Sequence, residues 1–294
     1  MVSRITGQML QQSAQLNLQT SMAALAKLQS QAGTQKLISK PSDDPAGAGE
    51  SMRIRADQRA LTQYATNIND GMAWLSTADS ALSNATDTMQ TVRDLVVQGA
   101  NSGSLNPAAR EAIATQLDSL KAALLSTANT KYAGRSIFAG NSDAGEAFTA
   151  AYATTAAAGS SVDRRVSPTA TVRVDADGAT AFGTGATSAF ALIDTIAADL
   201  RAGNDVTTHI AGVDNALSSI LGEQSRVGSR YNQLETSKEL NMSQAGSLEN
   251  QRASVEDVDL SKVILELKTQ EVAYQTALAV TSRALQPTLM SFLA

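Results

Sequence analysis

The 294-residue chain contains no cysteine and only one histidine, His209. Without thiols it can form no disulfide, no zinc–thiolate site and no cysteine nucleophile. A single histidine excludes a multi-histidine metal site and leaves a catalytic triad with only one possible base. We expect His209 to be a surface or packing residue, because no nucleophile elbow accompanies it in the sequence.

Nucleotide-binding glycine motifs are also missing, since neither GxGxxG nor GxxxxGKS/T occurs. The stretch Asp175-Ala-Asp177-Gly178 has the first residues of a calcium loop, but Ala179 and Ala186 occupy its fifth and twelfth positions, where oxygen ligands belong. A hairpin turn at Asp177-Gly178 is the better interpretation. With no catalytic constellation in the chain, we expect no enzyme, no cofactor and no metal site.

Aromatic residues make up only 4% of the chain, and the apolar residues are mainly small or aliphatic. This composition favours closely packed helices over a sheet sandwich. No apolar run is long enough for a membrane span, and glutamines break the N-terminal segment, so we expect neither a membrane partner nor a cleaved signal peptide. The net charge of -5 argues against a nucleic-acid partner.

Acidic residues are absent from residues 1–42, which carry Arg4 and three lysines. By contrast, residues 254–294 hold five acids against three basic residues. Opposite charges on paired helices favour pairing and fix register, so we expect the two ends of the chain to pair.

The strongest pattern is an apolar stripe with alternating spacings of three and four residues. Its seven-residue repeat runs through Leu61, Ile68, Leu75, Leu82, Met89 and Val96. The stripe predicts a helix from Pro45 to Gln98, roughly 80 Å long at 1.5 Å per residue. Small residues such as Gly71 at the second stripe position would let a neighbour approach closely. Asn106 and Pro107 then predict the cap and first residue of a second, antiparallel helix.

The sequence character changes between residues 138 and 189, where β-branched and polar residues alternate, which predicts a small β-rich outer insert. The helical pattern returns near Ala189, breaks at residues 253–262, and resumes to the C-terminus. We therefore predict a mainly α fold, a long-helix bundle with paired N- and C-terminal coiled-coil helices. The predicted domains are a terminal helical domain (1–44 plus 255–294), a helical bundle (45–137 plus 190–254) and the insert (138–189).

Adjacent carboxylates stand in the stretch "ISKPSDDPAGAGE" at residues 38–50. They could belong to a metal or acid–base site, but partner ligands are few nearby. The favoured interpretation is a helix joint formed by Pro41, Asp43, Asp44 and Pro45. Asp44 would cap the long helix, Pro45 would occupy its first turn, and Pro41 would keep the preceding segment from staying helical.

The apolar stripes at the two ends allow two interpretations: a coiled coil within one monomer, or assembly with neighbouring subunits. The C-terminal "LQPTLMSFLA" stays apolar almost to its last residue, and its apolar surface is wider than a two-stranded pair needs. We therefore predict an assembly interface. Its predicted residues are Ile5, Met9, Leu16, Leu260, Ile264, Leu267, Tyr274, Leu278, Leu285, Leu289 and Phe292.

Taken together, these segments resemble the flagellin superfamily, and within it the proteins of the hook–filament junction. The similarity covers roughly residues 1–140 and 190–294. It is carried by "ISKPSDDPAGAGESMRIR", "NINDGMAWLSTADSALSNATDTMQTVRDLVVQGAN", "NTKYAGRSIFAG", "SRVGSRYNQLE" and "LELKTQEVAYQTALAVTSRALQPTLMSFLA". The "TMQTVRDLVVQGAN" part is also similar to flagellin itself, and the small insert matches poorly.

The resemblance implies a structural adaptor that joins hook to filament as a helical ring. Its partners would be further copies of itself, the first hook-associated junction protein, flagellin, and a cytoplasmic export chaperone at the C-terminal region. It implies export through the flagellar type III apparatus to an extracellular site, with termini that fold on assembly. The alternatives are a short flagellin that forms the filament itself, and, from another class, a helical enzyme or chaperone-like bundle.

Overall fold

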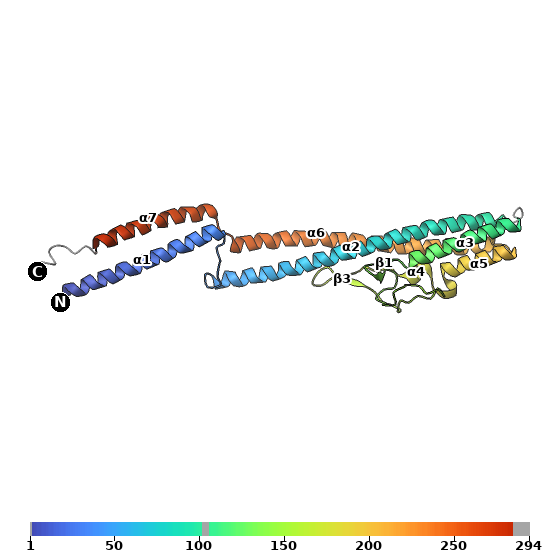
Figure 1. The fold of residues 1–294 in the computed structure, drawn as a ribbon, viewed down its shortest axis with the longest axis horizontal. Coiled ribbons are helices and arrows are strands. Elements are labelled where there is room, and N and C mark those ends of the chain that lie inside the picture. Colours follow the sequence, from blue (N-terminus) through green and yellow to red (C-terminus); the bar gives the residue numbers. More distant parts are fainter. Residues whose placement is uncertain (1, 102–105, 285–294) are drawn as a thin grey trace. The chain divides into compact units, whose positions relative to one another are not determined.

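The computed structural model describes residues 2–101 and 106–284. The chain is mainly helical (Figure 1), which confirms the predicted fold class. Its long helices are α1 (Val2–Thr34), α2 (Pro45–Ala100), α3 (Pro107–Ala128), α5 (Ala189–Ala202), α6 (Ile210–Glu256) and α7 (Leu260–Ala284). The shorter elements are α4 (Gly178–Phe182), η2 (Gly185–Thr187), η3 (Thr207–His209) and strands β1 (Lys131–Tyr132), β2 (Arg135–Ser136), β3 (Asp163–Arg165) and β4 (Thr171–Arg173).

The chain forms two compact units, one of residues 1–59 with 245–294 and one of residues 60–244. We refer to them as the terminal unit and the bundle unit. The three-part domain division expected from the sequence stays a prediction. Among the described residues, no helix combines the length and apolar character that a bilayer crossing requires.

The apolar stripe of α2 forms a large part of the hydrophobic core of the bundle unit. Ile68, Leu75, Leu82, Met89 and Val96 are all 0% exposed. The same holds for the second stripe positions Ala78, Ala85 and Val92. A stripe buried on this scale confirms the predicted packing seam.

Helix α3 begins where the sequence predicts. The Asn106 side chain accepts a hydrogen bond from the Ala109 amide at 2.7 Å, and Pro107 is the first helical residue. In Figure 1, α3 lies beside the last part of α2, and α5 packs against α3. The predicted helical hairpin is therefore present.

The insert is stabilised by a small aromatic core. Phe138, Phe148, Phe182 and Phe190 are each no more than 1% exposed, with ring centroids 5.3–5.8 Å apart in the contacting pairs. Its regular strands, β3 and β4, are three residues each and pair antiparallel. The insert is thus folded mainly by packing of its loops around these rings.

The hairpin turn predicted at Asp177-Gly178 is wrong. The turn between β3 and β4 lies at residues 166–170, where the Val166 amide donates to the Ala170 carbonyl. Asp177 instead caps α4, accepting a hydrogen bond from the Thr180 amide at 3.1 Å. The same side chain suits a turn or a helix cap, and here the cap prevails.

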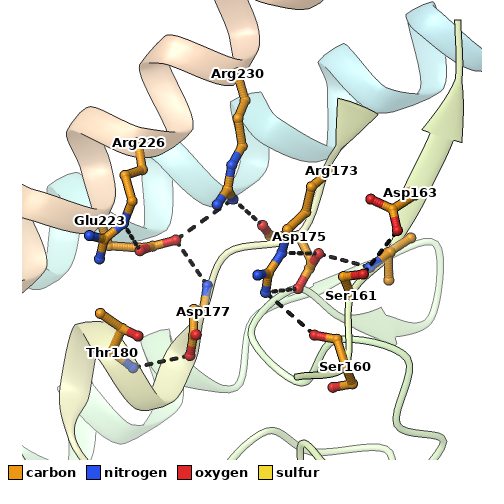
Figure 2. A network of polar contacts seen from close by, with 11 residues as sticks. Ser160, Ser161, Asp163, Arg173, Asp175, Asp177, Thr180, Glu223, Arg226 and Arg230 are labelled. Carbon is orange, nitrogen blue, oxygen red and sulfur yellow. Dashed lines mark hydrogen bonds and ion pairs between the residues drawn. The ribbon is translucent and has the colours of Figure 1, made fainter. Parts of the chain in front are cut away.

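A buried ionic network fastens the insert to α6 (Figure 2). Asp175 and Glu223 are both 0% exposed. Asp175 accepts two hydrogen bonds from Arg173, at 2.9 and 2.8 Å, and its carbonyl accepts one from Arg230 at 2.7 Å. Glu223 lies 3.8 Å from Arg230 and accepts the Asp177 amide at 3.0 Å. Because both carboxylates have partners, their burial is compensated.

Candidate assembly site

The terminal helices α1 and α7 pack against each other within the terminal unit. Half-buried positions of α1 recur at helical spacing, at Leu18, Leu25 and Leu28. On α7, Val263 is buried, and the Gln270 amide group donates to the Ser21 carbonyl at 3.4 Å. Each helix therefore covers one stripe of the other, and the rest of its surface remains accessible.

Large apolar side chains gather on the accessible surface of this pair. Nine described residues of α1 and α7 are between 40% and 70% exposed: Met9, Leu16, Met22, Leu260, Ile264, Leu265, Val272, Leu278 and Val280. Isolated exposed apolar residues are ordinary, whereas a concentration of them on two helices is a pattern typical of interaction surfaces. We call these nine residues the terminal apolar face.

The structure separates the predicted interface residues into groups. Met9, Leu16, Leu260, Ile264 and Leu278 belong to the terminal apolar face. Leu267 and Tyr274 are half-buried. Ile5 lies in α1, while Leu285, Leu289 and Phe292 lie outside the described residues. The interface itself stays a prediction, because it requires a partner.

The helix joint contains both predicted carboxylates, and each one holds backbone amides. Asp44 accepts hydrogen bonds from the amides of Ala46 and Gly47, both at 3.0 Å, at the start of α2. Asp43 accepts from the Lys40 amide at 2.9 Å and from the Ser39 amide at 3.2 Å. These hydrogen bonds, that of Lys40 first, lower the pKa of Asp43.

Helix α1 ends at Thr34, six residues earlier than a stop at Pro41 would place it. Gln35 follows with φ of 57°, the left-handed conformation typical of a residue just past a helix end. Pro41 stands in the turn closed by the Asp43 amide and the Lys40 carbonyl, 2.9 Å apart. Residues 35–40 are not helical, as expected for the segment before Pro41, and α1 already ends at Thr34.

Glu256 links the segments that lie before and after the helix joint. Only 2% exposed, it accepts hydrogen bonds from Nε and Nη2 of Arg55, both at 2.7 Å, and a further one from the Ser51 hydroxyl. The Lys36 ammonium lies 3.6 Å away. The Arg55 hydrogen bonds, helped by Ser51 and by the charges of Arg55 and Lys36, lower the pKa of Glu256 from 4.5 to about 2.

Backbone pairing joins the same segments. The Leu37 amide donates to the Glu256 carbonyl at 2.7 Å, and the Val258 amide donates to the Gln35 carbonyl at 3.2 Å. These two bonds flank an antiparallel bridge between Lys36 and Asp257. We call the contacts among Lys36, Ser51, Arg55 and Glu256, together with this bridge, the Glu256 clasp.

Sequence reasoning missed the Glu256 clasp, although a signal for it was present. The acid-free start and acid-rich end of the chain predict attraction between the two ends. Lys36–Glu256 is an ion pair of this kind, and it lies at the joint rather than along the helices. Arg55, by contrast, is 201 residues from Glu256, and no local pattern indicates that pairing.

His209 is half-buried and contacts a carboxylate. Its Nε2 lies 2.7 Å from Asp199, which also accepts a hydrogen bond from Asn204. This contact joins η3 to the end of α5. The described part of the chain contains no cluster of three acidic or histidine residues that could hold a metal ion.

Comparison with known families gives two matches along the chain. The bacterial flagellin N-terminal helical region matches residues 5–143, and the bacterial flagellin C-terminal helical region matches residues 210–293. Together they take in well over half of the chain and leave out most of the insert. All residues of the Glu256 clasp, α7 and α1 from residue 5 onward fall within the matched regions.

Individual relatives match over most of their length. Flagellar hook-associated protein 3 of Salmonella typhimurium is 28% identical over 300 residues, covering 93% of this chain and 94% of the relative. Flagellin of Bacillus subtilis is 25% identical over 264 residues, covering 85% of each. The solved structure of flagellar hook-associated protein 3 from Legionella pneumophila matches with a TM-score of 0.61 at 15% identity, covering 69% of this chain and 98% of that one.

Proposed function

Because the chain belongs to the flagellin family, we propose that it is a structural subunit of the bacterial flagellum that joins the hook to the filament. The observation that carries the proposal is the terminal apolar face, which the described residues of the chain leave exposed. Sequence similarity to a flagellar hook-associated protein extends over 93% of this chain and supports a position at the hook–filament junction.

Assembly through the terminal helices has a sufficient driving force. Burying a fully exposed Leu, Val or Met side chain contributes about 1.5–3 kcal/mol. Leu265, Val272 and Val280 are each more than 60% exposed, so each can still gain much of this amount. Several such side chains per subunit offset the loss of rotational and translational freedom when neighbours pack together.

The partners that fit this role are other copies of the chain in a ring, the first hook-associated junction protein on one side and flagellin on the other. An export chaperone at the C-terminal region would cover apolar helix surface before assembly. Export through the flagellar type III system would place the subunit outside the cell. The family membership supports each of these partners by analogy.

The alternative within the family is a short flagellin that forms the filament itself. Similarity to Bacillus subtilis flagellin over 85% of both chains favours it. The two functions differ in what a cell lacks when the protein is missing: a junction subunit leaves flagellin with nowhere to assemble, whereas a filament subunit is itself the missing material.

Deletion of the gene tests the proposal. We expect cells with intact hooks, no filaments, and unassembled flagellin in the medium, all restored by the wild-type gene. Normal filaments, or cells without hooks, would contradict the junction role. Hooks without filaments and no other flagellin in the medium would indicate the filament subunit.

A further inference from the structure

We infer that the Glu256 clasp sets the register of the terminal helices: it forms in the isolated chain and fixes where α1 ends relative to where α7 begins, before any neighbour covers the terminal apolar face. This inference rests on the proposed function for its purpose, because register matters only if the pair presents a defined surface to partners. The clasp itself can be tested on the chain alone.

The first argument is that every contact of the clasp is internal to the chain. Arg55 and Ser51 lie on α2, and Glu256 is the last residue of α6. Charge-assisted hydrogen bonds to a side chain that is 2% exposed are shielded from water. The terminal apolar face, by contrast, is left exposed by the part of the chain that the structure describes. The clasp can therefore form before α1 and α7 contact neighbouring subunits.

The second argument is that the clasp specifies register to a single residue. The bridge pairs Lys36 with Asp257 through two backbone hydrogen bonds, one on each side. A slip of one residue would break both of these backbone hydrogen bonds and shift Lys36 relative to Glu256, whose side chain Arg55 and Ser51 hold in place. Side-chain and backbone contacts thus favour the same alignment.

The third argument is proximity. Helix α1 ends at Thr34, one residue before the Gln35 carbonyl that takes part in the bridge, and α7 begins at Leu260, two residues after Val258. Because so few residues separate the bridge from the two helices, the alignment of the bridge also fixes the alignment of α1 with α7. The Asp259 side chain adds to this by accepting the Ser261 amide at 2.9 Å at the start of α7.

Hydrogen exchange on the full-length monomer tests whether the clasp forms alone. We expect the amides of Leu37 and Val258 to exchange at least about tenfold more slowly than unbonded amides. Glu256→Gln and Arg55→Leu should remove this protection while the amides of the α2 stripe keep theirs. The matched control is Glu50→Gln, which breaks the exposed Glu50–Arg53 pair on the same helix. Unprotected Leu37 and Val258 in the wild type, or protection unchanged in both clasp variants, would overturn the inference.

A disulfide test measures register independently of amide exchange. The chain has no cysteine, so the double variant Lys36→Cys/Asp257→Cys can form only one intramolecular bond. We expect this pair to close readily in the monomer, because residues opposite each other in such a bridge lie about 4.5–5.5 Å apart. The pair Lys36→Cys/Val258→Cys, shifted by one residue, should close far more slowly. Equal closure of the two pairs would contradict a fixed register.

The two proposals fail in different ways. Neither exchange nor disulfide closure involves a partner, so a missing clasp would leave the role at the junction untouched. A gene deletion that spares the filament would end the junction proposal while the clasp could still be observed in the monomer.

Discussion

The bundle unit and the terminal unit contain similar apolar stripes, yet their stripes have different surroundings. Along α2 in the bundle, Leu75 and Leu82 are 0% exposed. On α7, Leu265 and Val272 are 70% and 62% exposed. The bundle surrounds its stripe with α3, α5, α6 and the insert, whereas α1 and α7 pack mainly against each other among the described residues. The number of neighbours, more than the stripe itself, decides whether such a pattern forms a core or an interface.

The largest effect should come from placing a charge in the buried stripe. Leu75→Asp loses the burial of a side chain that is 0% exposed and introduces an unpaired carboxylate. We expect the free energy of unfolding to fall by more than about 4 kcal/mol. Urea unfolding of the monomer, followed by circular dichroism, measures it. An unchanged midpoint would show that the α2 stripe is not the core of the bundle.

An intermediate effect on stability should come from changes in the Glu256 clasp. Its central side chain is as buried as a core residue, although it lies in the terminal unit. Arg55→Leu leaves a carboxylate that is 2% exposed without its two-bond partner, at a cost of about 2–3 kcal/mol to local stability. The pKa of Glu256 should rise from about 2 toward or above 4.5. A carbon-13 NMR titration of the Glu256 carboxyl group measures the change.

The pH dependence of the clasp follows from the lowered pKa. Ionised Glu256 stabilises the folded clasp fully above pH 4.5, and this contribution is lost as the pH falls from 4.5 through about 2. The clasp should therefore persist at neutral and mildly acidic pH. Arg53→Leu, which removes the exposed partner of Glu50, is the control and should leave the Glu256 titration unchanged.

A smaller effect should distinguish close from open packing within the bundle. A Cβ atom at Gly71 would lie 2.9 Å from Cγ1 of Val174 and 3.0 Å from Cδ1 of Leu234, whereas one at Gly228 would meet nothing within 4 Å. Gly71→Ala should therefore cost about 1 kcal/mol despite its better helix propensity. Gly228→Ala should stabilise by about 0.5–1 kcal/mol. Urea unfolding compares the two, and the same sign for both would contradict close packing at Gly71.

Local signals in the sequence predicted much of the fold correctly. The seven-residue repeat gave the buried stripe of α2, and Asn106-Pro107 and Asp44-Pro45 marked helix starts, because caps and repeats act within a few residues. Reasoning from short motifs failed where two local structures compete. Asp177-Gly178 suits a hairpin turn as well as a cap, and α1 ends at Thr34, where the sequence has no strong stop signal.

The candidate site was less predictable because its main contacts are distant in sequence. Arg55 and Glu256 are 201 residues apart, and nothing near either one indicates the other. Ser51 joins them only because α2 places it one turn from Arg55. The opposite charges of the two chain ends indicated attraction, but only the structure shows that Glu256 is its centre.

The smallest effect on the monomer should accompany the largest effect on assembly. Leu265→Asp makes the same substitution as Leu75→Asp, at a side chain that is 70% exposed. We expect the free energy of unfolding to change by less than about 0.5 kcal/mol. In the deletion strain, however, the variant should fail to restore filaments, because a neighbouring subunit would have to bury the new charge. Gln275→Asp adds the same charge at an exposed polar position of α7 and should restore them. Filaments with Leu265→Asp, or a large loss of monomer stability, would show that the terminal apolar face is not an assembly surface.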